Sequence, residues 1–111
     1  MRLHERFEWD ANKARYNLRN HRVSFDDAAT VLADERASDL HVEEFDAAHS
    51  RAEERWITTG SHPADRRIVL RIAWTERADA PGSALLTRII SARPATAAER
   101  RRYESEIAHK E

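Results

Sequence analysis

Arginine side chains stand near the ends of two neighbouring segments that the sequence predicts to be strands. The polar residues there are Thr75, Glu76 and Arg77 in the first segment and Ser91 and Arg93 in the second. The planar guanidinium of arginine forms paired, charge-assisted hydrogen bonds with phosphate oxygens and stays protonated at neutral pH. Strand ends of this composition indicate a surface that binds a phosphodiester beside one carboxylate.

Such a set of residue types is typical of a ribonuclease that works without metal. A base takes the proton of the ribose 2′-hydroxyl, arginines stabilise the pentacovalent transition state, and an acid protonates the leaving oxygen. We expect Arg93 and Arg77 to act on the phosphate. The candidate proton carriers are His21, Glu76, Tyr103 and Lys13.

The same side chains also have structural interpretations. An imidazole at His21 can cap the carbonyls of a preceding helix, Glu76 can pair with a neighbouring arginine, and Tyr103 can pack one helical turn from Ile107. The six histidines lack the spacing of metal ligands, and two glycines are too few for a phosphate-binding loop. The sequence therefore predicts no metal site and no cofactor.

Charge is segregated along the chain, although the net charge is only −1. Residues 26–54 carry ten acids against Arg36 and Arg51, whereas residues 86–103 carry five arginines against Glu99. If these two regions fold onto different faces, the molecule has an anionic side and a cationic side. The cationic side suits the binding of RNA. Any single arginine can equally be an ordinary solvated residue.

The 111 residues contain neither a repeat nor a linker rich in glycine, serine or proline, so a single domain over residues 1–111 is expected. Cysteine is absent, and no apolar run is long enough for a membrane span or a signal peptide. These features predict a cytoplasmic protein with no membrane contact. Alanine dominates the apolar residues, and so thin a core favours a stabilising partner.

Hydrophobic periodicity predicts an α+β fold with two N-terminal helices, a four-stranded antiparallel sheet and a C-terminal helix. Short connections between consecutive strands favour a meander, whose apolar face the helices would cover from one side. Thr96 and Glu99 form a capping box for the last helix. The expected helices cover 11–20, 25–34 and 97–108, and the expected strands cover 40–45, 55–60, 68–76 and 85–93.

Alternation along the last two strands assigns their faces. On the last strand, Arg88 and Arg93 fall on opposite faces unless a bulge intervenes. We therefore place Arg93 at the chemistry and keep Arg88 as an additional binding residue. The row expected in the core consists of Ile68, Leu70, Ile72 and Trp74.

A series of short motifs runs through nearly the whole chain. In order, they are Phe7-Glu8-Trp9-Asp10, Lys13, Asn17, His21 with Val23-Ser24-Phe25, Ala28-Ala29 with Val31, Glu53-Glu54-Arg55-Trp56, Thr75-Glu76-Arg77, Arg88-Ile89-Ile90-Ser91-Ala92-Arg93, Ala95-Thr96, and Glu99-Arg100 with Tyr103. This ordered set resembles the BrnT toxins of bacterial type II toxin–antitoxin systems.

The resemblance implies a RelE-like fold and a ribonuclease that arrests growth. It also implies neutralisation by a BrnA antitoxin, encoded next to the toxin and similar to ribbon-helix-helix DNA-binding proteins, in a complex with two copies of each chain. That complex represses its own operon, so operator DNA would be contacted mainly by the partner. With RNA as the substrate, the residues expected to bind it are Lys13, Arg88, Ser91, Thr75 and Tyr103.

The chain departs from the family pattern at two places. Arg22 stands where the family usually has a glycine, which suits a left-handed helix terminus, and residues 78–84 lengthen a hairpin next to Arg77. Two other functions remain open. The chain could bind RNA or an acidic partner by charge without cutting, or it could serve mainly to hold a DNA-binding partner and act as a co-repressor.

Overall fold

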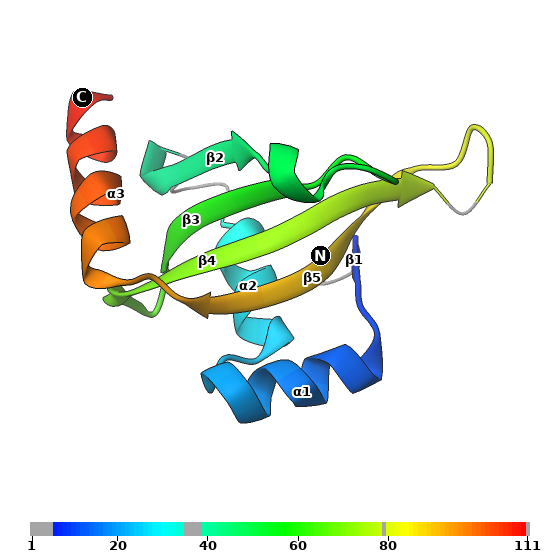
Figure 1. The fold of residues 1–111 in the computed structure, drawn as a ribbon, viewed down its shortest axis with the longest axis horizontal. Helices are drawn as coiled ribbons and strands as arrows, with labels where there is room; N and C mark the ends of the chain where they lie inside the picture. The colour runs from blue at the N-terminus through cyan, green and yellow to red at the C-terminus, as the bar shows by residue number, and fades with distance from the viewer. Residues whose placement is uncertain (1–5, 35–38, 79, 111) are drawn as a thin grey trace.

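The protein folds around a five-stranded sheet with helices on both faces (Figure 1). The computed structural model describes residues 6–34, 39–78 and 80–110. The strand order across the sheet is β1-β5-β4-β3-β2. The elements are β1 (Phe7–Glu8), α1 (Ala11–His21), α2 (Phe25–Leu32), β2 (His41–Phe45), the 3-10 helix η2 (Ala47–His49), β3 (Trp56–His62), β4 (Asp65–Ala78), β5 (Leu85–Pro94) and α3 (Ala97–His109).

The α+β class is confirmed, but the expectation of four antiparallel strands is wrong. The short strand β1 pairs in parallel with β5, opposite Thr87 and Arg88, and makes the sheet mixed. Two residues are too few to show a strand periodicity. The pairing of β1 depends on a contact between chain segments about eighty positions apart, which local patterns do not reveal.

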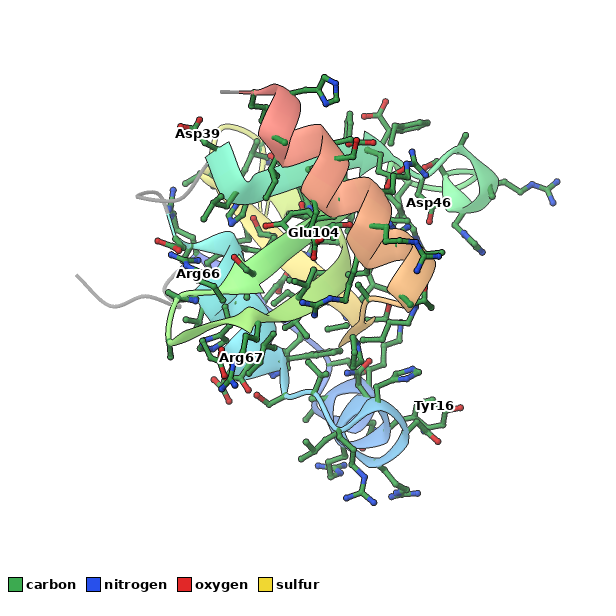
Figure 2. All side chains as sticks on the ribbon, turned by 90° about the vertical axis from the view of Figure 1, so that its left-hand side faces the viewer. Tyr16, Asp39, Asp46, Arg66, Arg67 and Glu104 are labelled. Carbon is green, nitrogen blue, oxygen red and sulfur yellow. The ribbon has the colours of Figure 1, made fainter. Side chains whose placement is uncertain are left out.

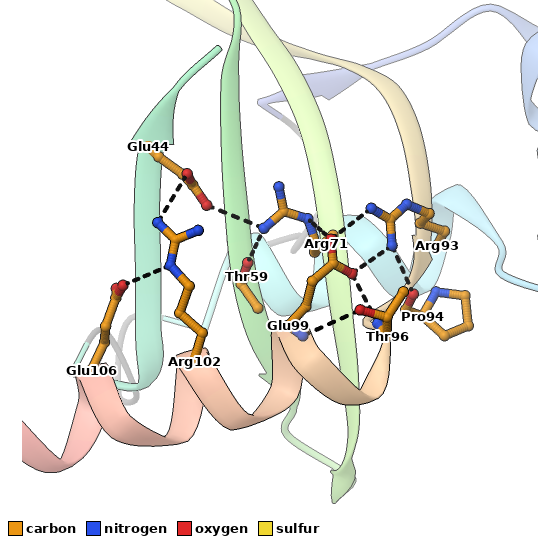
Figure 3. Close-up of polar contacts among 9 residues, drawn as sticks. All are labelled: Glu44, Thr59, Arg71, Arg93, Pro94, Thr96, Glu99, Arg102 and Glu106. Carbon is orange, nitrogen blue, oxygen red and sulfur yellow. Dashed lines mark hydrogen bonds and ion pairs between the residues drawn. The ribbon is translucent and has the colours of Figure 1, made fainter.

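The helices also differ from the expectation that all would cover one face. Helices α1 and α2 pack on one face of the sheet, and α3 lies against the other (Figures 1 and 3). The side chains beneath α3 are polar, and Arg71 of β4 pairs there with Glu99 of α3. Because α3 carries few apolar residues, ion pairs and one buried tyrosine, Tyr103, hold it in place.

The core lies between α2 and the sheet. Three members of the row expected there, Leu70, Ile72 and Trp74, are buried against α2 residues such as Phe25. Ile68, the fourth member of this row, is 46% exposed, so its expected burial is wrong; it borders an open hollow near the start of α2. The expected capping box of Thr96 and Glu99 at the start of α3 is confirmed, and the side chains of Asp10 and Ser24 cap α1 and α2.

A bulge between β4 and β5 decides where the arginines of β5 point. Ala73 pairs with Ser91 and Trp74 pairs with Ile89, so Ile90 is the extra residue. Beyond the bulge the alternation is reset, and Arg88 faces the same side as Arg93. The two arginines that simple alternation separates therefore share the face that α3 partly covers.

Candidate functional site

Arginines of β4 and β5 form two separate groups on the α3 face. Arg71 is directly opposite Arg93, and Arg77 is opposite Leu86, next to Arg88. Six positions along β4 separate Arg71 from Arg77, which corresponds to about 20 Å. The expectation that Arg77 and Arg93 bind one phosphate together is therefore wrong, and Arg71 is the cross-strand neighbour of Arg93.

Glu99 of α3 pairs with both arginines of the first group (Figure 3). Its carboxylate accepts hydrogen bonds of 2.7 and 2.8 Å from Arg93 Nη1 and Nη2. Arg71 Nε lies 3.1 Å from the same carboxylate and forms an ion pair with it. Hydrogen bonding from Arg93, with further contributions from the Thr96 N–H group and the charge of Arg71, lowers the pKa of Glu99 to about 2 against the opposing effect of burial. The same bonds raise the pKa of Arg93.

The stability of the protein is expected to depend on the ionisation of Glu99. Its pKa in the folded state is about 2, below the ordinary value of 4.5, so the carboxylate favours folding above about pH 4.5 and this contribution disappears as the pH falls towards 2. After allowance for partial exposure, we expect a loss of about 1 kcal/mol from this group. Urea unfolding at several acidic pH values measures it, and Glu99→Gln should flatten this part of the profile. An unchanged profile in the variant would contradict the assignment.

Glu8 of β1 pairs with the second group of arginines. Its carboxylate accepts hydrogen bonds from Arg77 Nε and from Nη2, the latter at 2.9 Å, and Arg88 Nη1 lies 3.9 Å from it. Hydrogen bonding from Arg77 lowers the pKa of Glu8. Glu8 belongs to the first sequence motif, but nothing in the sequence places it beside Arg88, because the pairing of β1 with β5 creates that contact.

Asn17 of α1 occupies the edge of β5 beyond β1. Its amide donates to the carbonyl oxygens of Ala92 at 2.7 Å and Val23 at 2.9 Å, and its Oδ1 accepts the Ala92 N–H at 3.0 Å. Asn17 is only 4% exposed. Its side chain therefore pairs with the backbone of β5 much as another strand would, and it attaches α1 to that edge. Sequence reasoning assigned no role to this residue.

The attachment of Asn17 places two predicted site residues beside β5. Lys13 and His21 are four positions before and after Asn17, so all three lie on one side of α1. Helix α1 runs alongside β5 in the same direction (Figure 1), so His21 lies towards the end of β5 that bears Arg93. We call this edge of β5 the basic edge; the side chains along it are Lys13 and His21 from α1, and Arg88, Ser91 and Arg93, which point to the α3 face of β5.

Three predicted site residues lie away from the basic edge. Glu76 faces the opposite side of the sheet, where it lines a hollow with Trp74. Thr75 and Tyr103 are buried, and their hydroxyls donate to the carbonyl oxygens of Glu54 at 2.6 Å and Leu40 at 2.5 Å. These two hydroxyls hold chain segments together, so the structure corrects their assignment as substrate ligands.

The departures from the family pattern leave the site intact. Arg22 keeps the left-handed helix end with φ of 59° and donates its N–H to Leu18 at 3.0 Å, at a cost of about 1–2 kcal/mol in backbone strain. Arg77 remains paired with Leu86 in the sheet, so the longer hairpin begins only after the site. Across residues 6–34, 39–78 and 80–110, no helix is long and apolar enough to cross a membrane, and no three acidic or histidine side chains converge to hold a metal ion.

The fold and the basic edge define a small α+β protein with basic side chains along one edge of its sheet, and comparison with known proteins identifies its family. Residues 9–99 match the family described as the ribonuclease toxin BrnT of type II toxin–antitoxin systems. The chain therefore belongs to the BrnT family, which confirms the resemblance of its motifs. As a member of a toxin–antitoxin family, it has an antitoxin as its partner.

A solved structure shares the fold. The crystal structure of the Brucella abortus ribonuclease toxin BrnT is similar, with a TM-score of 0.51 and 20% sequence identity over 81% of this chain and 95% of that chain. At this identity the likeness concerns the fold alone. A comparison with curated proteins gives no match.

Proposed function

We propose that this chain is a cytoplasmic ribonuclease that cuts RNA at the basic edge without a metal ion and is neutralised by an antitoxin resembling BrnA. The observation that carries the proposal is the attachment of Asn17 to Ala92, the neighbour of Arg93 in β5, which brings the side of α1 that bears His21 and Lys13 to the edge of this strand. Membership of a family of ribonuclease toxins supports RNA as the substrate. The antitoxin complex would hold two copies of each chain and contact operator DNA through the antitoxin.

The placement of the side chains suggests how the reaction proceeds. His21 takes the proton of the ribose 2′-hydroxyl, whose oxygen forms a bond with phosphorus as the bond to the 5′-oxygen breaks. The Lys13 ammonium gives a proton to that leaving oxygen. Arg93, which is 40% exposed, stabilises the extra negative charge on the phosphate, while Arg88 and Ser91 hold the neighbouring backbone. Glu76 is on the other face and takes no part.

The test uses the purified chain and a synthetic single-stranded RNA in a buffer that contains EDTA. We expect cleavage with products that end in a 2′,3′-cyclic phosphate, because the 2′-oxygen is the nucleophile. The matched control is the same RNA with 2′-O-methyl groups, which should stay intact. Cleavage of the methylated strand, or activity that EDTA abolishes, would disprove this mechanism.

A second candidate function is RNA binding without cleavage. It is favoured by the pairing of Arg77 with Glu8 and of Arg93 with Glu99, since carboxylates already occupy these guanidinium groups. Under this function the RNA remains whole, and its affinity falls gradually as basic residues are removed one at a time. The same RNA assay, followed by a binding measurement, separates the two functions.

A further inference from the structure

The face of the sheet that carries α1 and α2 has an uncovered end with a strongly acidic lining. Beyond α2, two hollows of about 370 and about 460 Å³ share Glu43, Trp74 and Glu76 in their walls. The second hollow also borders Glu53 and Glu54, and the first also borders Arg6, so four glutamates in the two linings face one arginine. We call these joined hollows the acidic groove. It faces away from α3 and from the two arginine groups.

Aromatic rings run across the floor of the acidic groove. Phe45 of β2 packs edge-on against Trp56 of β3 with centroids 5.1 Å apart, and Trp56 stacks on Trp74 of β4 at 6.3 Å. These residues are cross-strand neighbours, which explains the continuous row. Phe45 remains 46% exposed and Leu85, at the opposite rim, 59% exposed. Exposed apolar side chains of this size beside a hollow are typical of a binding surface.

Of the four glutamates that line the acidic groove, Glu53 pairs with Arg55 at 3.4 Å, and the other three are not neutralised by an ion pair within the described chain. Glu43, Glu54 and Glu76 are exposed and make no ion pair with any residue of the described ranges, although this chain has many arginines. By contrast, Glu8, Glu44 and Glu99 on the other face all pair with arginine. Like charges gathered around one hollow repel each other, and a cationic partner would relieve that repulsion.

We propose that the acidic groove binds a basic segment of the antitoxin, with arginine or lysine side chains lying on the aromatic row and pairing with the glutamates. This inference rests on the proposed function, because it takes the antitoxin as the partner. Guanidinium groups stack on tryptophan faces and bind carboxylates at the same time, so the lining matches them in both respects. The acidic groove would repel RNA phosphates, and the basic edge stays free for RNA.

The experiment compares two variants in a binding titration with the antitoxin encoded by the adjacent gene. Glu43→Lys with Glu54→Lys reverses two exposed charges in the acidic groove. Asp39→Lys with Glu104→Lys makes the same change in net charge, and Figure 2 shows both control positions on the side of the molecule that bears α3. We expect the groove variant to lose about 100-fold in affinity and the control less than about 3-fold. Wild-type affinity should also fall as salt is raised.

Several outcomes would overturn the proposal. Equal affinity of the groove variant and the wild type would reject the groove while leaving the antitoxin as partner. Absence of any wild-type binding would reject both the partner and the groove, whereas RNA cleavage in the same preparations tests the proposed function separately. If light scattering shows that the wild type alone forms dimers that the groove variant loses, a second copy of this chain is the occupant instead.

Discussion

Replacement of Arg93 by alanine is expected to lower the rate of RNA cleavage by about 10²–10³-fold, the usual effect of removing one donor that stabilises a transition state. Arg93 is the arginine of the basic edge that lies at the same end of β5 as His21, and its guanidinium is partly exposed. Single-turnover cleavage of a synthetic RNA measures the effect. In cells, the variant should no longer arrest growth when it is produced without the antitoxin.

Arg93 also pairs with Glu99, so a loss of activity must be separated from a loss of α3 docking. Glu99→Gln supplies the matched control, because glutamine preserves the capping box with Thr96 but removes the charge that Arg93 faces. We expect this variant to keep cleaving RNA even if it unfolds at a lower temperature. Arg101→Ala, at an exposed position of the same helix, should be neutral. Equal activity of Arg93→Ala and the wild type would remove Arg93 from the mechanism.

The parts of the fold that the sequence predicted correctly depend on short-range contacts. The capping box of Thr96 and Glu99 joins groups three residues apart, so its signal is visible in any short window. The strand ranges followed from alternating side chains that bury one face. The three helices and four of the strands could therefore be placed from composition and spacing.

The candidate site depended on contacts that no short window contains. Glu8 meets Arg77 and Arg88 only because two residues of β1 join the sheet, and the common face of Arg88 and Arg93 results from one extra residue at Ile90. The sequence also did not predict on which face of the sheet α3 packs. Glu99 is recognisable in the sequence only as part of the cap of its own helix, whereas in the structure it also pairs with arginines on two strands. Arginine composition predicts phosphate binding, whereas long-range pairing decides which arginines are neighbours.

Replacement of Asn17 by alanine is expected to lower the free energy of unfolding by about 2–4 kcal/mol, because buried groups that lose a hydrogen-bond partner cost about 1–3 kcal/mol each. The change removes the partner of the Ala92 N–H and C=O and of the Val23 C=O at a site that is only 4% exposed. Urea or thermal unfolding measures the loss. The variant should also cleave RNA more slowly, because α1 positions His21 and Lys13 through this side chain.

Two further substitutions separate this role from ordinary helix propensity. Asn20→Ala removes an exposed amide that donates to the Tyr16 carbonyl at 2.8 Å within the same helix, and it should change stability by less than about 0.5 kcal/mol. Asn17→Asp keeps an acceptor for the Ala92 N–H but directs carboxylate oxygens at two carbonyls, so it should destabilise at least as much as alanine. If Asn17→Ala unfolds like Asn20→Ala, the edge of β5 does not need its amide partner, and another contact must hold α1 beside Arg93.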